Sequence, residues 1–188
     1  MGNAARIPKL SAADYLTWEV KQSERNIFVR GEVFAMSGGT AEHNEATIDA
    51  AIALKRHLKG TSCKVFATDM RLRFETADCY YYPDVFVTCA AADINDPKRT
   101  TLTSAKLIIE VLSPSTAAFD RGDKFADYRT LETLEEYALI DPDGHSIDVF
   151  RKGDDGLWVL HPSNATAPAV HFESVGWVGE VGDLLNAA

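Results

Sequence analysis

The sequence predicts an α/β or α+β fold, with a mixed central β-sheet flanked by helices. One reason is the order of the segments, in which helical stretches alternate with groups of strand-like stretches. Another is the composition: 46% of the 188 residues are hydrophobic and 25% are charged, as in globular proteins. No repeat, low-complexity tract or flexible linker divides the chain. We therefore expect residues 1–188 to form a single domain.

The first elements are marked by capping residues. Leu10 and Tyr15 flank a Ser11-x-x-Asp14 cap at the positions of a hydrophobic staple, which predicts an N-terminal helix. Residues 27–36 predict two short strands that turn near Gly31.

A second helix is expected after the loop at residues 37–40. Thr40 is suited to cap its start, and Gly60 to end it. Its buried face is predicted from residues at helical spacing, with Lys55 extending its amine to water. These residues are Ile48, Ala51, Ile52, Lys55 and Leu58.

The remaining elements alternate in the same way. Four strands are expected at residues 64–67, 70–74, 80–88 and 105–112, and a helix at about 120–131. Shorter strands at 136–140, 146–151 and 157–160 follow, separated by turns that are rich in glycine, proline and aspartate.

The net charge of −9 gives no support for binding to nucleic acid, because proteins that neutralise phosphates usually have a basic surface. A solvated acidic surface that aids solubility explains the total charge. The positive charges are nevertheless uneven, since several fall close together in one stretch. They are Lys55, Arg56, Lys59, Lys64, Arg71 and Arg73.

The cellular setting is predicted to be the cytoplasm. The stretch from Met1 to Arg6 lacks the charged-then-apolar pattern of a secretory signal, and no apolar run is long enough to span a membrane. Cys63, Cys79 and Cys89 match no zinc-binding or C-x-x-C spacing. An odd number of lone cysteines favours a reducing compartment.

Glu110 is the most informative residue for function. It interrupts the apolar run from Leu107 to Leu112, which is typical of a strand buried on both faces. An ionised carboxylate there costs several kcal/mol unless it is paired, protonated or bound to a metal. The structural alternative is a buried ion pair with a distant arginine.

Asp84 follows Pro83 at the start of a strand-like segment, where proline implies a strand end or edge. Taken alone, such an aspartate is more often a turn residue. Together with Glu110 it predicts a pair of oxygen ligands suited to Mg²⁺ or Mn²⁺. A metal held there can activate water at a phosphoryl centre, and a nearby cation such as Lys124 can stabilise the transition state.

These residues belong to a longer pattern that resembles the Uma-two family, whose members are described as restriction endonucleases. The pattern comprises Tyr82-Pro83-Asp84-Val85, the string from Ile109 to Thr116, Asp120, Lys124, Tyr128, Glu136-Tyr137 and Asp141-Pro142. It also includes Gly31-Glu32, the Gly38-Gly39-Thr40 loop with His43, and Asp69. The resemblance covers about residues 15–160 and implies a restriction endonuclease-like domain of the PD-(D/E)XK nuclease-like superfamily.

The resemblance implies that Asp84 and Glu110 hold the metal. The motif's lysine is expected two residues after Glu110, but Leu112 stands there. The resemblance suggests that Lys124 supplies the amine from the following helix, as a flexible point charge can do. The alternative is an exposed lysine that pairs with Asp120 or Asp127.

Four further residues are expected to support this site: Glu32, His43, Asp69 and Tyr128. His43 lies near a helix start, where it can meet a phosphate or brace a metal ligand. An exposed or capping histidine is an equally good interpretation. Glu32 also fits a surface strand, and Asp69 a turn.

The hypothesis that follows is a Mg²⁺-dependent endonuclease that hydrolyses DNA with metal-activated water, as a homodimer and without membrane contact. One alternative is a nuclease fold that no longer cleaves and serves as a binding or assembly module. Another is a metal-dependent phosphohydrolase acting on a different substrate. The leucine at position 112 and the acidic charge favour the inactive module.

Overall fold

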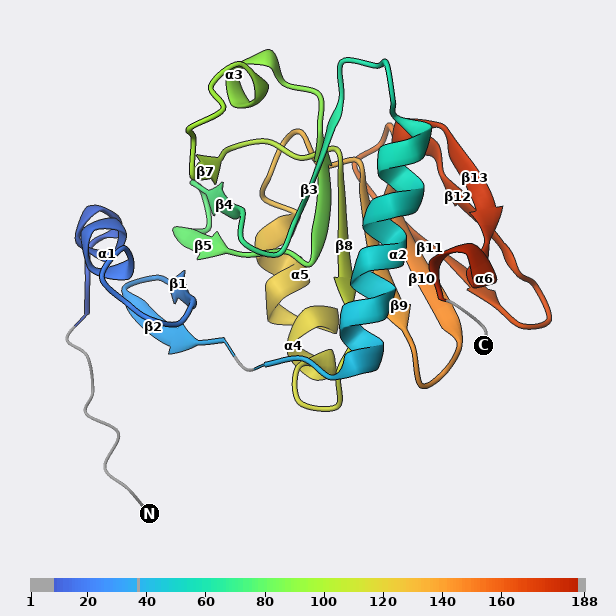
Figure 1. Ribbon diagram of the computed structural model, residues 1–188, viewed down its shortest axis with the longest axis horizontal. Helices are drawn as coiled ribbons and strands as arrows, with labels where there is room; N and C mark the ends of the chain where they lie inside the picture. The colour runs from blue at the N-terminus through green and yellow to red at the C-terminus, as the bar shows by residue number, and fades with distance from the viewer. Residues whose placement is uncertain (1–8, 37, 186–188) are drawn as a thin grey trace.

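The computed structural model describes residues 9–36 and 38–185. The stretch from Met1 to Arg6 and Ser37 of the predicted loop lie outside the described residues. In the described chain, mixed β-sheets are flanked by helices, so the predicted fold class is confirmed (Figure 1).

The N-terminal part builds a five-stranded sheet with one helix against it. Helix α1 (Ala12–Glu19) is capped as predicted, because the Ser11 side chain accepts a hydrogen bond from the Asp14 N–H at 3.1 Å. Gly31, at φ +92°, makes the turn between the first two strands, a conformation that favours glycine. The sheet order is β2 (Glu32–Ala35), β1 (Asn26–Val29), β5 (Cys79–Tyr81), β4 (Arg71–Phe74) and β7 (Thr101–Leu102).

A six-stranded mixed sheet forms the larger layer. Its order is β11 (Trp158–Asn164), β10 (Ser146–Lys152), β9 (Glu136–Asp141), β8 (Leu107–Val111), β6 (Val85–Thr88) and β3 (Lys64–Ala67). Strands β8 and β9 are parallel, and the other neighbours are antiparallel. The strand that carries Glu110 is therefore central, whereas β3 lies at an edge.

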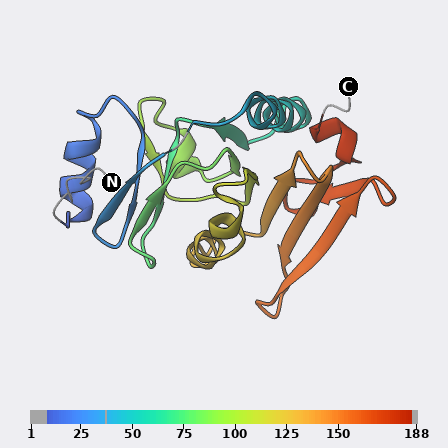
Figure 2. The ribbon, with the colours of Figure 1, turned by 90° about the horizontal axis from the view of Figure 1, so that it is seen from below.

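Helices cover both faces of this sheet. Helix α2 (Ala41–His57) packs on one face, and the pair α4 (Ala117–Arg121) and α5 (Asp123–Tyr128) packs on the other (Figure 2). Because successive strand residues point to opposite faces, Ile109 and Val111 join the core beneath α2. Glu110, between them, points toward α5.

The predicted buried stripe of α2 is partly wrong. Ala50, Leu54 and Leu58 are buried, but Ile48 and Ile52 are 47% and 41% exposed. Since the helix is fixed by its packing against the sheet, the small alanines lie where the sheet comes closest, and the two isoleucines face away. Apolar side chains therefore remain on the outer surface of α2.

Two predicted segments are divided in the structure. The strand expected at 80–88 breaks into β5 and β6 at Pro83-Asp84, because proline cannot donate to a ladder. The helix expected at 120–131 breaks at Gly122, whose ψ of −103° is not helical, and ends earlier, at Tyr128. Both breaks place polar groups at the same end of the sheet.

Several short elements were not predicted. Each has four residues or fewer, too few for a periodic pattern to show. They are α3 (Ala91–Ile94), β7 (Thr101–Leu102), β12 (Ala169–Phe172), a 3₁₀ turn (Glu173–Val175), β13 (Trp177–Glu180) and α6 (Val181–Leu184).

The cysteines differ from the expectation of three lone thiols. Cys63 and Cys89 form a disulfide, and Cys79 is free and buried. The pairing follows from the strand register, since Lys64 lies opposite Thr88 and the next residues out are the two cysteines. The argument for a reducing compartment thus loses its basis. In residues 9–36 and 38–185, no helix is long and apolar enough to cross a bilayer.

Candidate active site

Asp84 lies in the bend between β5 and β6, and its position is fixed by the neighbouring strand. Its Oδ2 accepts a hydrogen bond from the backbone N–H of Val111 at 2.8 Å, so the carboxylate lies beside the end of β8. The side chain is 18% exposed. Burial by itself would raise the pKa of Asp84, but the contact with His43 and the charge of Lys124 hold it below its ordinary value. Asp84 is therefore ionised at neutral pH.

Glu110 is almost completely enclosed, with 3% of its side chain exposed. Its Oε1 accepts a hydrogen bond from the Tyr128 hydroxyl at 2.5 Å and lies 2.9 Å from Nζ of Lys124. Burial raises the pKa of Glu110 to about 8, although Lys124 acts in the opposite direction. The cation that compensates this carboxylate is a lysine from α5, not the distant arginine of the alternative interpretation.

Lys124 pairs with two of the three carboxylates that line the site. Its Nζ lies 2.9 Å from Glu110 Oε1 and 2.9 Å from Asp120 Oδ1, and the side chain is only 13% exposed. Burial would lower the pKa of Lys124, but the charges of Glu110 and Asp120 raise it, so the amine stays protonated. The pair with Asp120 was foreseen for an exposed helix face, yet here it is buried beside Glu110.

Asp120 was missed as a site residue. Its side chain is 3% exposed, its carboxylate accepts from Lys124, and its backbone carbonyl accepts from the Tyr137 hydroxyl at 3.0 Å. The sequence contained one signal, since Asp120 and Lys124 are four residues apart and can meet on one helical face. The break at Gly122 lies between them, and the pair still forms.

His43 lies in the first turn of α2, close to Asp84. Its Nε2 is 3.3 Å from Asp84 Oδ2. The contact with Asp84 raises the pKa of His43 more than burial lowers it. A Cβ added at Gly39 would lie 3.0 Å from Nδ1 of His43, so the glycine permits a close approach of the loop to the ring. His43 therefore braces Asp84 in this structure.

The structure does not bring two of the predicted supporting residues to the site. Glu32 is 58% exposed and pairs with Lys9 at 3.9 Å. Asp69 is 75% exposed and pairs with Arg25 at 3.4 Å. Glu32 begins strand β2 at the surface and Asp69 lies in the bend before β4, as their alternative interpretations allowed.

The carboxylates, His43 and Lys124 face one cavity of about 170 Å³. Ser113, Thr116 and the Gly38-Gly39 loop also line it. No cluster of three His, Cys, Asp or Glu side chains suited to a metal occurs among the residues that the structure describes. Magnesium usually needs only one or two carboxylates, with waters and phosphates completing its shell. The ionised Asp84 and the buried Glu110 at a cavity wall fit this requirement.

A family model described as "Putative restriction endonuclease", the Uma2 (Uma-two) family, matches residues 12–178. The chain belongs to the Uma2 family. The match begins in α1 and extends into β13, so it takes in Asp84, Glu110 and Lys124 together.

Two proteins of Synechocystis are similar to this Uma2 chain over most of its length. "Uncharacterized protein slr1290" is 37% identical over 158 residues, which cover 84% of this chain and 82% of that protein. "Uncharacterized protein sll1609" is 36% identical over 151 residues, which cover 80% and 85% respectively.

The fold of this Uma2 chain is similar to a crystal structure from Anabaena variabilis, of a "putative nuclease belonging to DUF820". The TM-score is 0.78 at 16% sequence identity, and the match covers 94% of this chain and 98% of the other. At that identity the likeness shows a shared fold. The chain thus has the family and the fold of restriction endonuclease-like proteins.

Proposed function

We propose that this protein is an endonuclease that hydrolyses DNA phosphodiester bonds with Mg²⁺ or Mn²⁺, as one nuclease-like domain that acts as a homodimer. The observation that carries the proposal is the contact of Lys124 Nζ with Glu110 Oε1 at 2.9 Å, beside Asp84 and in the same cavity. Leu112 leaves the motif's usual lysine position without an amine, and α5 provides one from elsewhere.

Asp84 and Glu110 would hold the divalent ion. When bound, such an ion supplies a nucleophilic water and neutralises charge on the phosphoryl oxygens. Lys124 is protonated because its pKa is raised, so it acts as a cationic hydrogen-bond donor and not as a base. Tyr128 fixes the orientation of Glu110, and His43 fixes Asp84.

The proposal is tested by incubating supercoiled plasmid and single-stranded circular DNA with Mg²⁺ or Mn²⁺. We expect the parent to nick or cut, and Asp84→Asn to lose cleavage while keeping its thermal unfolding midpoint. Glu32→Gln, whose carboxylate lies at the surface, is the matched control and should cut like the parent. An Asp84→Asn variant that cuts as well as the parent would overturn the assignment.

A non-cleaving binding or assembly module is the second candidate, because Leu112 and the net charge of −9 favour it. Calorimetric titration of the parent and Glu110→Gln with Mg²⁺ separates the two. Metal binding that is absent in the variant supports the enzyme. Absence of binding in the parent, with and without DNA, favours the module. Cleavage of small phosphodiesters but not of DNA would instead indicate a different phosphorylated substrate. A cytoplasmic location stays a prediction.

A further inference from the structure

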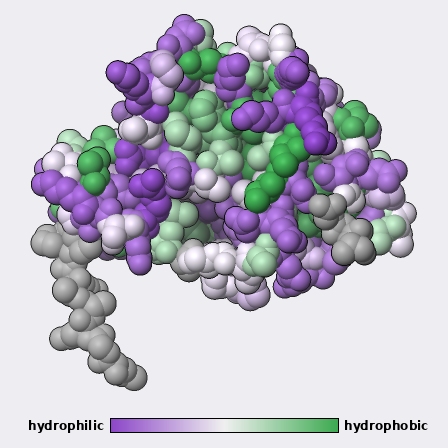
Figure 3. All heavy atoms as spheres, viewed as in Figure 1, coloured by the Kyte–Doolittle hydropathy of each residue, from purple (hydrophilic) through white to green (hydrophobic). Residues whose placement is uncertain are grey.

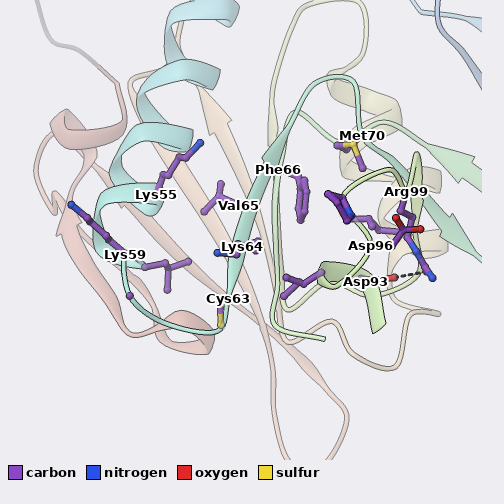
Figure 4. Close-up of a pocket in the computed structure, with 15 residues that line it drawn as sticks. Lys55, Lys59, Cys63, Lys64, Val65, Phe66, Met70, Asp93, Asp96 and Arg99 are labelled. Atoms are coloured by element: carbon purple, nitrogen blue, oxygen red, sulfur yellow. Dashed lines mark hydrogen bonds and ion pairs between the residues drawn. The ribbon is translucent and has the colours of Figure 1, made fainter. Parts of the chain in front are cut away.

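A groove that shares no lining residue with the cavity at Glu110 surrounds the edge strand β3. Its volume is about 590 Å³, larger than the cavity at Glu110. One wall is the C-terminal end of α2 and the turn after it, and the other is the segment from Asp93 to Leu102. Figure 4 shows Lys55 and Lys59 on one side of β3, and Asp93, Asp96 and Arg99 on the other.

The floor of this groove is apolar. Leu58, just after α2, and Val65 and Phe66 of β3 line it, with Met70 and Ile94 opposite. Val65 and Phe66 are only partly buried, although both belong to the protein's hydrophobic clusters. Figure 3 shows this apolar surface beside α2, bordered by hydrophilic side chains. Interfaces with duplex DNA are more polar and more positively charged than interfaces with proteins, so the apolar floor favours a peptide as the occupant.

The edge of β3 offers backbone groups as well. Within the described residues, β3 pairs only with β6 in its sheet. The Thr68 N–H donates to the Asp84 carbonyl, which sets the alternation of the ladder. Val65 and Ala67 therefore direct their N–H and C=O groups away from β6, toward the open edge. An extended peptide can satisfy such groups by adding a strand.

The charge of the groove selects the kind of peptide. On the far wall, Asp93 is compensated by Arg99 at 3.1 Å, whereas Asp96 accepts a hydrogen bond from the backbone N–H of Lys98. Among residues 9–36 and 38–185, the lysine ion pairs are made by Lys9, Lys106 and Lys124. The groove residues Lys55, Lys59 and Lys64 are exposed and make none.

We propose that this groove binds an extended acidic peptide segment of a partner protein, which adds as a strand to β3. Acidic side chains of the segment lie toward Lys55 and Lys59 on the α2 side, and alternate apolar side chains lie toward Phe66 on the other side. Lysines at the edge discourage pairing with neutral or basic strands and so favour an acidic one. This binding is independent of the chemistry at Glu110.

The test uses the peptide ELEVEL-amide, labelled with fluorescein at its N-terminus, and fluorescence anisotropy with the full chain at low salt. We expect saturable binding, and no binding of the KLKVKL peptide. The double variant Lys55→Glu/Lys59→Glu should weaken binding by about tenfold. Lys21→Glu, an exposed lysine outside the groove, is the matched control and should bind like the parent.

Strand addition is tested on the peptide, so that folding of the protein is not in question. One peptide carries N-methyl groups on its glutamate amides, and another on its alternate, apolar residues. Only one of the two sets faces β3, so we expect one methylated peptide to bind and the other to fail. Equal binding of both peptides would overturn strand addition. Lysine variants that weaken the binding of a 20-base-pair duplex, with unchanged peptide binding, would make the groove a nucleic-acid contact and overturn the proposal.

Discussion

The Tyr128 hydroxyl donates a hydrogen bond to Oε1 of Glu110 at 2.5 Å, with both side chains buried. Tyr128→Phe removes this donor and leaves a buried carboxyl oxygen with one partner fewer. We expect the free energy of unfolding in urea to fall by about 1–3 kcal/mol. Tyr80→Phe, in a ring that stacks on Tyr15, is the comparison and should cost less. Equal losses of unfolding free energy in the two variants would mean that the Tyr128–Glu110 hydrogen bond adds no stability of its own.

The pKa of Glu110, raised to about 8, predicts how stability depends on pH. Between the unfolded pKa of Glu, near 4.3, and about 8, the folded protein keeps a proton that the unfolded chain has lost. The stabilisation that this proton provides is therefore complete below the unfolded pKa. It is lost as the pH rises, at about 1.4 kcal/mol per pH unit. Urea unfolding at pH 5.5, 6.5 and 7.5 should show this slope as the difference between parent and Glu110→Gln. Plots of unfolding free energy against pH that run parallel for the parent and Glu110→Gln would contradict this prediction.

The approach of Gly39 to His43 gives a pair of matched variants. Gly39→Ala places a methyl group 3.0 Å from Nδ1 of His43, whereas Gly38→Ala meets nothing within 4 Å. We expect the first change to move the ring away from Asp84 and to lower the His43 pKa toward its ordinary value. NMR titration of the imidazole signals measures this, and the Gly38→Ala spectrum should match the parent. A His43 pKa unchanged by Gly39→Ala would show that the ring tolerates the methyl group.

Lys124 is the cation on which the proposed chemistry depends. Lys124→Met removes a donor at the reacting centre, so the rate of plasmid cleavage should fall by about 100-fold or more. The control is Lys106→Met, since Lys106 forms a partly exposed pair with Glu135 at 3.1 Å. Its cleavage rate should stay close to that of the parent. A cleavage rate within a few-fold of the parent for Lys124→Met would remove Lys124 from the mechanism.

The disulfide between Cys63 and Cys89 closes a loop with a sequence separation of 26. Thiol titration of the denatured, unreduced protein should therefore find one thiol, that of Cys79, and three after reduction. Reduction should lower the free energy of unfolding by about 3 kcal/mol, because the unfolded chain regains loop entropy. Three thiols in the unreduced protein would show that the bond does not form under the conditions used.

Capping signals predicted the first half of the fold well. Ser11, Gly31 and Thr40 act locally, so their effect can be read from a few neighbouring residues. The only sign in the sequence that the long strand divides at Pro83-Asp84 was the proline, which cannot donate a hydrogen bond inside a sheet. The outward turn of Ile48 and Ile52 on α2 was not predictable, because it depends on how closely the sheet approaches the helix.

The candidate site was likewise predictable only in part from the sequence. The burial of Glu110 followed from the apolar run around it, and the choice of Lys124 came from a family resemblance. That Lys124 also holds Asp120, and that Glu32 and Asp69 lie elsewhere, depends on contacts between distant elements. Residue types and spacing cannot specify such contacts without the fold.

The parallel pairing of β8 with β9 has a consequence for the newly made chain. Parallel neighbours require a crossover, and here the crossover contains α4 and α5, which carry Asp120 and Lys124. The register of Glu110 opposite Leu139 cannot form until β9 has left the ribosome. Non-local pairing of this kind forms slowly. The contact of Lys124 with Glu110 therefore forms late, when the crossover packs back onto the sheet, and a nascent chain that ends before β9 lacks the completed cavity.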